Sequence, residues 1–188
     1  MANNQGSVFV VCGPTAVGKG TVLKEVFRRG TNLWYSVSAT TRPARPGEID
    51  GRDYFFVSNE EFDALVAAGD MLEWAVVHKV HRYGTPRKPV ERAMEAGKTV
   101  ILEVDLDGAR QIRKTMPEVK QIFIAPPSWE ELKARLIGRA TECAEEQARR
   151  LETAKTELDA QGEFDVVVVN DSVADATEQI LHILGISE

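Results

Sequence analysis

The sequence predicts an α/β fold in which helices cover both faces of a central parallel sheet. Short apolar runs rich in β-branched residues alternate with longer amphipathic stretches, and this alternation is typical of strand–helix–strand units with parallel strands. A glycine-rich loop also separates the first apolar run from the first helical stretch. The predicted strands are Val8–Cys12, Thr99–Val104, Gln121–Ala125 and Val166–Val169.

The helices between these strands are predicted from their apolar periodicity and from the residues at their ends. Gly30 and Gly97 end two of them, and Pro117 stops a third. Three serines open helices as N-caps, each with a carboxylate three residues later: Ser58 with Glu61, Ser128 with Glu131, and Ser172 with Asp175. The sequence thus predicts helices at Thr21–Arg29, Val90–Ala96, Asp107–Lys114 and about Val173–Leu184.

Two segments interrupt the alternation. The stretch from Trp34 to Thr85 is rich in short strand patterns and in proline and glycine, which predicts a small insertion on the main sheet rather than a separate domain. A polar patch from Gly138 to Glu146 falls between two helical stretches. We therefore expect one domain that spans residues 6–186.

Composition excludes several classes of protein. The chain carries 23 basic and 29 acidic residues, a net charge of −6. This balance argues against a nucleic-acid or anionic-membrane partner, because both attract positive proteins. The longest apolar run has five residues, the N-terminus shows no leader pattern, and only two cysteines occur. We expect a cytoplasmic protein with reduced cysteines, and either a monomer or a homodimer is compatible with the sequence.

The glycine-rich loop is the most specific motif in the chain. Gly13-Pro14-Thr15-Ala16-Val17-Gly18-Lys19 has the spacing G-x-x-x-x-G-K and lies between a predicted strand and a predicted helix. Such a loop turns backbone N–H groups toward phosphate oxygens, and its lysine adds a positive charge. The motif predicts a three-layer core of the P-loop NTPase type that binds a nucleotide triphosphate.

The position after Lys19 departs from this pattern. A serine or threonine usually stands there and binds Mg²⁺ through its hydroxyl, whereas this chain has Gly20 followed by Thr21. Mg²⁺ could be held through water, or the loop could resemble the Gly-Lys-Gly-Thr form of adenylate kinases. We name no protein side chain as a direct metal ligand.

A second group of residues lies in the strand-rich insertion. Arg42 and Arg45 stand three residues apart on a proline-stiffened loop, a pattern that suits two guanidinium groups directed at one anion. Tyr54 and Tyr83 add hydroxyl donors further along the chain, and an ionised Glu73 can accept paired N–H groups.

These motifs together resemble the guanylate kinase family over nearly the whole chain. The resemblance rests on the phosphate-binding loop, on Ser36–Glu48, on the segments around Tyr54 and Tyr83, and on later motifs at 103–108, 123–128, 135–139 and 168–171. It implies a kinase that transfers a phosphoryl group from ATP to GMP, and to dGMP as well, with Mg²⁺ as cofactor. A phosphate-binding loop alone would indicate only a nucleotide.

The resemblance also assigns roles to individual residues. Arg42, Arg45, Tyr54 and Tyr83 would hold the GMP phosphate, and Ser38, Glu73, Thr85 and Asp105 would recognise guanine, with Glu48 and Glu103 in the same site. Lys19, Arg42, Arg135, Arg139 and Arg150 would be catalytic, the last three from a lid. ATP would contact residues 13–21 of the loop and Asn170. Tyr54 could instead be strand packing, Asp105 could cap the following helix, and Arg149 could take the role of Arg150.

The same resemblance divides the chain into functional segments. It places the core at 6–35, 89–136 and 151–186, a GMP-binding subdomain at 36–88, and a helical lid at 137–150. One departure falls inside the GMP-binding segment, where Glu73 and Tyr83 are ten residues apart instead of the usual nine. His78 and His81 in this segment have no assigned role.

Three other functions are compatible with part of the pattern. A GTPase would share the D-x-x-G spacing at Asp105–Gly108, but it needs an Asn-Lys-x-Asp motif that this chain lacks. A non-catalytic module related to guanylate kinases would typically have lost the phosphate-binding loop, which is intact here. Another nucleoside monophosphate kinase would leave the Ser36–Glu48 block unexplained.

Overall fold

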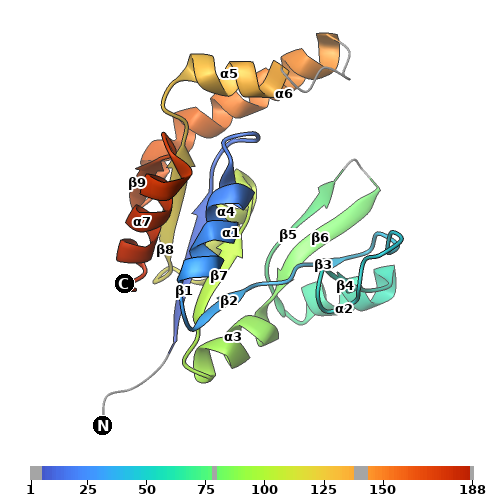
Figure 1. Ribbon diagram of the computed structural model, residues 1–188. Helices are drawn as coiled ribbons and strands as arrows, with labels where there is room; N and C mark the ends of the chain where they lie inside the picture. Colours follow the sequence, from blue (N-terminus) through green and yellow to red (C-terminus); the bar gives the residue numbers. More distant parts are fainter. Residues whose placement is uncertain (1–5, 78–79, 138–143, 187–188) are drawn as a thin grey trace.

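The computed structural model describes residues 6–77, 80–137 and 144–186. Its centre is a sheet of five parallel strands in the order β2-β7-β1-β8-β9 (Figure 1). The strands are β1 (Ser7–Cys12), β2 (Leu33–Tyr35), β7 (Thr99–Glu103), β8 (Lys120–Ala125) and β9 (Val166–Val169). The predicted α/β fold with a central parallel sheet is confirmed.

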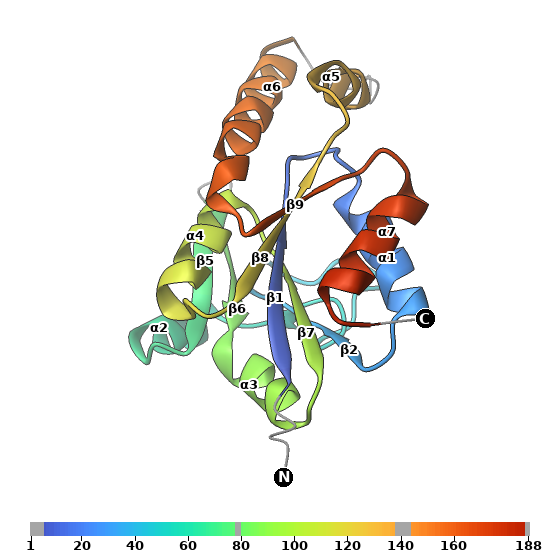
Figure 2. The same ribbon diagram turned by 90° about the vertical axis from the view of Figure 1, so that its left-hand side faces the viewer.

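Helices cover both faces of this sheet, as expected from the alternating pattern. One apolar cluster joins the sheet to α1 (Lys19–Arg29) and α7 (Val173–Ile183), which lie side by side in both views (Figures 1 and 2). The opposite cluster joins the sheet to α3 (Arg87–Glu95) and α4 (Leu106–Thr115). The core therefore lies in two layers, one on each side of the strands.

A second sheet projects from this core (Figure 1). Its order is β4-β3-β6-β5, and α2 (Asn59–Ala67) packs against it through Phe62. The strands are β3 (Ala39–Thr40), β4 (Phe55–Phe56), β5 (Met71–Val77) and β6 (His81–Pro86). The side chain of Gln111 on α4 bonds both backbone groups of Trp74 on β5, at 3.1 Å and 3.0 Å, and so fastens this sheet to the core.

The remaining helices stand at one end of the molecule. In Figures 1 and 2, α5 (Trp129–Ile137) and α6 (Ala144–Asp159) lie beyond the strand ends of the main sheet. A short 3₁₀ helix, η1 (Ala160–Glu163), leads from α6 toward β9. Leu132, Leu136 and Ala154 are buried and attach the two helices to the core.

The predicted caps and element bounds can be compared with the structure. Ser58 and Glu61 form a reciprocal capping box, and Ser172 caps α7 through the N–H of Asp175. Ser128 accepts from the N–H of Glu131, but the Glu131 carboxylate accepts from Arg135 instead of returning to the cap. The first helix begins two residues earlier than predicted, at Lys19, and α3 begins at Arg87 directly after Pro86.

Strand β2 was not predicted as a strand of the core sheet. It has only three residues, too few to show an alternating pattern, and the sequence places it at the start of the strand-rich insertion.

Among the described residues, none of the helices is both long and apolar enough to cross a membrane.

Candidate active site

The phosphate-binding loop leads from the end of β1 into α1. Gly18, the N-cap of α1, has φ of 98°, a left-handed conformation that favours glycine. A Cβ atom at this position would lie 2.8 Å from Nδ2 of Asn170. The loop therefore requires glycine here for both its backbone conformation and its close packing.

Lys19 follows at the first position of α1. Its Nζ donates to the carbonyl oxygen of Gly13 and, at 3.4 Å, to that of Pro14. The side chain therefore folds back over the start of the loop, where its ammonium contacts carbonyl oxygens. Beneath it, burial raises the pKa of the Cys12 thiol to about 12, which keeps this cysteine neutral.

Side chains from three other elements contact the backbone of the loop. Asn170, at the end of β9, donates to the carbonyl oxygen of Val17 at 2.8 Å, and Arg135 of α5 donates to the same oxygen at 3.3 Å. Glu157 of α6 accepts from the N–H of Thr15 at 3.3 Å. Asn170, predicted to contact ATP, is thus buried against the loop itself.

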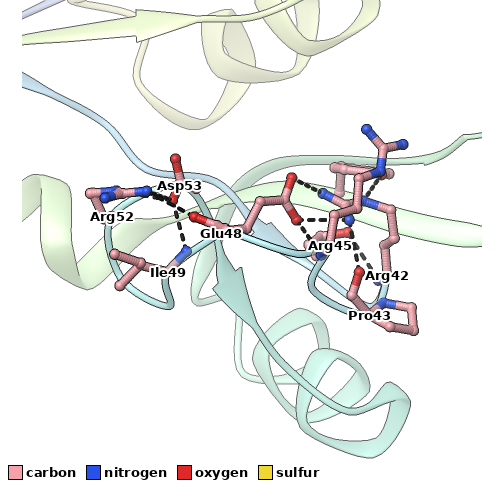
Figure 3. A network of polar contacts seen from close by, with 10 residues as sticks. Arg42, Pro43, Arg45, Glu48, Ile49, Arg52 and Asp53 are labelled. Atoms are coloured by element: carbon pink, nitrogen blue, oxygen red, sulfur yellow. Dashed lines mark hydrogen bonds and ion pairs between the residues drawn. The ribbon is translucent and has the colours of Figure 1, made fainter.

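Arg42 lies at the centre of a network in the second sheet (Figure 3). The Glu48 carboxylate accepts from its Nη1 and Nη2 at 2.9 Å and 2.8 Å, and its Nε donates to the Tyr83 hydroxyl at 3.1 Å. The guanidinium also lies over the ring of Tyr54, 5.3 Å from its centroid. Arg42 is 9% exposed, so these contacts hold its positive charge in place at the edge of the second sheet.

Glu48 organises this corner of the site. Besides Arg42, its Oε2 accepts from the backbone N–H of Arg45 at 2.7 Å, while the Arg45 residue is exposed. The hydrogen bonds from Arg42 and from Arg45 hold the pKa of Glu48 below its ordinary value. The carboxylate is therefore ionised and paired, and it orders the loop that carries both arginines.

The two tyrosines predicted near the anion lie together. Their rings meet edge to face with centroids 5.8 Å apart, and Tyr83 pairs with Ala75 across the β5–β6 ladder. The ten-residue separation from Glu73 therefore does not remove Tyr83 from the Arg42 cluster. His81 pairs with Val77 toward the far end of the hairpin, and His78 lies outside the described residues.

A group of acceptors lies at the junction between the second sheet and α4. The Thr85 hydroxyl donates to Glu73 at 2.6 Å. Burial raises the pKa of Glu73, an effect that the bond from Thr85 opposes and the nearby charge of Asp105 adds to. Asp105 caps α4 by accepting from the N–H of Gly108 at 2.8 Å, so the predicted capping role is observed.

A cavity of about 460 Å³ joins the two halves of the site. Its lining brings Lys19 and Thr15 of the phosphate loop together with Ser38 and Tyr54 of the insertion, and with Asp105 at the start of α4. Glu103 also lines it and accepts from the Tyr35 hydroxyl at 3.0 Å. The remaining predicted residues of the insertion are not part of this lining, although Arg42 adjoins it through Tyr54; they are Arg42, Arg45, Glu48, Glu73, Tyr83 and Thr85.

The predicted lid arginines are placed only in part. Arg135 reaches the phosphate loop from α5, and Arg150 lies on α6 with partial exposure. Arg139 falls in the segment 138–143, outside the described residues. Of the arginines that the structure describes, Arg135 is seen to contact the phosphate loop.

Sequence reasoning did not identify two residues that the structure places in the site. Gly108 packs so closely that a Cβ atom would lie 3.2 Å from both Asp105 Oδ1 and Glu73 Oε2. Glu157 lines the cavity although it is far from every motif in sequence. Glu157 sits in a charged helical stretch that resembles an ordinary solvated face, so no local signal distinguishes it.

Comparison with known proteins agrees with this geometry. A family model described as guanylate kinase matches residues 5–185. A guanylate kinase of Cutibacterium acnes (strain DSM 16379 / KPA171202) is 57% identical over 96% of this chain and 90% of its own length. One of Nocardia farcinica (strain IFM 10152) is also 57% identical, over 94% and 92%. The crystal structure of guanylate kinase from Anaplasma phagocytophilum matches with a TM-score of 0.72 and 35% identity, covering 96% of this chain and 85% of that one.

Proposed function

Since this chain belongs to the guanylate kinase family, we propose that its cleft binds ATP at the phosphate loop and GMP against the second sheet, and transfers the γ-phosphoryl group to give ADP and GDP. The activity follows from the family. The residue assignments rest on one observation above all: an ordered arginine, Arg42, on the loop after β3, lies over Tyr54, which lines the same cavity as Lys19. Similar contacts serve dGMP, which has the same base and phosphate.

The GMP half of the cleft is assigned by its donors and acceptors. Arg42, Arg45, Tyr54 and Tyr83 supply donors for a phosphate, and Glu48 orders the arginine loop rather than contacting the anion. Guanine carries adjacent N1–H and N2–H₂ donors, which one carboxylate accepts together. Glu73 is suited to them, with Thr85, Asp105 and Ser38 nearby. We assign residues 36–88 as the GMP-binding subdomain.

Chemistry in this cleft needs positioning more than proton transfer. The GMP phosphate is largely ionised and is itself the nucleophile, so the site requires no strong general base. Lys19 and Arg42, with Arg135 from the base of the proposed lid at 137–150, offset negative charge as the phosphoryl group passes between in-line oxygens. Closure of the lid would exclude water and suppress hydrolysis of ATP.

Kinases that use ATP need a divalent metal ion, and we propose Mg²⁺ held by the nucleotide phosphates and by water. Gly20 supplies no hydroxyl, and among residues 6–77, 80–137 and 144–186 no three acidic, His or Cys side chains are grouped as direct ligands. Asp105 and Glu103 line the cavity with oxygens that can accept from water bound to the ion.

Both the nucleotide substrates and the reduced Cys12 fit a cytoplasmic location.

The choice of acceptor tests the assignment of Glu73. With ATP as donor, we expect GMP to be phosphorylated far faster than AMP, UMP or CMP, because those bases leave the Glu73 carboxylate without its paired donors. Glu73→Gln should raise KM for GMP by about 10²-fold, since a hydrogen bond to a charged group is lost. Coupled ADP-release assays measure both.

KM for GMP should also rise as the pH falls. Because burial raises the pKa of Glu73, its carboxylate becomes protonated at a higher pH than an exposed glutamate and then no longer accepts both guanine donors.

The matched control is Glu60→Gln, which removes a charge from an exposed site on α2 of the same subdomain. It should leave KM for every acceptor unchanged. Comparable turnover of AMP and GMP by the unaltered chain would overturn the guanine assignment.

The close approach at Gly108 gives a second prediction for this half of the cleft. Gly108→Ala places a Cβ atom 3.1 Å from Val104 Cβ and 3.2 Å from Glu73 Oε2, so the guanine acceptors must shift. We expect KM for GMP to rise roughly five- to tenfold, as for a mild overpacking, with KM for ATP unchanged. Gly162→Ala, where an added Cβ meets nothing within 4 Å, is the control. Equal effects of the two variants on KM for GMP would contradict this view of Gly108.

A further inference from the structure

The buried carboxylate of Glu157 has no role in the site as described so far. It lies on α6 and is only 9% exposed, yet it lines the cavity that also contains Lys19. A negative charge beside a site for a polyphosphate repels the ligand, so its position there requires a compensating contact. That contact is the N–H of Thr15, which donates to Glu157 Oε2 at 3.3 Å.

Two charges and one backbone donor surround Glu157. Burial raises its pKa, while the charge of Lys19 on α1 and the bond from Thr15 oppose this rise; Asp105 at the start of α4 adds to it. The carboxylate thus lies between one cation and one anion in the lining of the cavity, and it accepts a hydrogen bond from the backbone of the phosphate loop.

The part of α6 that carries Glu157 is firmly fixed. Ala154, one turn earlier, is buried in the cluster below α1 and α7, and Leu158 packs against both apolar clusters. Asn170 and Arg135 hold the loop at the carbonyl of Val17, and Lys19 bonds the carbonyls of Gly13 and Pro14. Thr15, in the first half of the loop, is exposed. Glu157 therefore joins the exposed Thr15 of this first half to a rigid part of α6.

We propose that Glu157 is a positioning residue of the ATP site, which fixes Thr15 in the first half of the phosphate loop through its N–H and ties it to α6. The inference rests on the assignment of this loop to ATP. It acts through hydrogen-bond acceptance rather than through charge, because the charge alone would disfavour the phosphates.

Two conservative variants separate these contributions. Glu157→Gln keeps an acceptor oxygen at the same reach and loses the charge, whereas Glu157→Asp keeps the charge and is one methylene too short for Thr15. We expect KM for ATP, and Kd for a non-hydrolysable ATP analogue measured by calorimetry, to rise about tenfold in Glu157→Asp and less than about threefold in Glu157→Gln. KM for GMP should stay within twofold in both.

Glu152→Gln and Glu152→Asp make the same changes at an exposed position of α6 and should leave both constants unaltered. The proposal is overturned if Glu157→Gln raises the Kd for the analogue as much as Glu157→Asp, or if neither variant raises it. It is also overturned if KM for ATP and KM for GMP rise together with a lower melting temperature. Analogue binding is measured without turnover. A chain that bound the analogue as expected but failed to phosphorylate GMP would contradict the proposed function and leave this inference supported.

Discussion

Lys19→Ala should lower kcat for phosphorylation of GMP by about a thousandfold or more, a loss typical of a removed donor in phosphoryl transfer. The lysine begins α1 and bends back over Gly13 and Pro14, where the loop would hold the phosphates of ATP. Its ammonium would offset charge that spreads over the transferred group. Steady-state assays with saturating ATP and GMP measure the change.

The fold should tolerate this substitution. Lys19 is only partly buried, and its side chain donates hydrogen bonds to carbonyl oxygens of its own loop. We expect the thermal unfolding midpoint to stay close to that of the unaltered chain. Lys24→Ala removes an exposed lysine from the same helix and should keep full activity. Turnover by Lys19→Ala within tenfold of normal would refute a catalytic role for the loop lysine.

Arg42→Ala should reduce kcat/KM for GMP by about 10³-fold, the effect of losing an arginine that stabilises phosphoryl transfer. The loss has two sources. The donor itself disappears, and Glu48 loses the partner that keeps its carboxylate paired, which leaves a negative charge near the expected phosphate. Arg42→Lys should restore little, since an ammonium cannot reproduce the two parallel bonds to Glu48 or the stacking on Tyr54.

Arg52→Ala is the matched control for Arg42. This arginine is exposed in the same insertion and bonds its neighbour Asp53 (Figure 3). We expect its kcat/KM for GMP to fall less than about threefold, as for an exposed ion pair. Calorimetry with the ATP analogue should give the same Kd for both variants and the unaltered chain. A weaker analogue affinity in Arg42→Ala would show that the arginine serves the other half of the cleft.

The sequence predicted the parts of this molecule whose signals are local. The core strands β1, β7, β8 and β9 are continuous apolar runs, and the phosphate loop has a spacing that few other structures require. Ser58 and Ser172 cap their helices as predicted, because a cap depends on residues only three positions away. Strand β2 was missed because its three residues carry too little pattern.

The contacts that assemble the site are long-range, and no local pattern encodes them. Asn170 was predicted to contact ATP, but its position under the loop depends on how β9 and α1 pack. Glu48 is an exception, because it lies only six residues from its partner Arg42. Gly108 and Glu157 become visible only when α4 and α6 are placed beside the cavity. Their roles follow from tertiary proximity.

On the proposed assignment, helix α4 would distribute base recognition over both parts of the molecule. Its first turn carries Asp105 and Gly108 against Glu73, while its last turns hold β5 through Gln111. On the proposed assignment, the insertion contributes only some of the guanine contacts and the core supplies the rest. Grafting residues 36–88 onto another kinase core would therefore transfer the arginine loop but not a complete base pocket. Substrate choice in such a chimaera would follow the host helix as much as the graft.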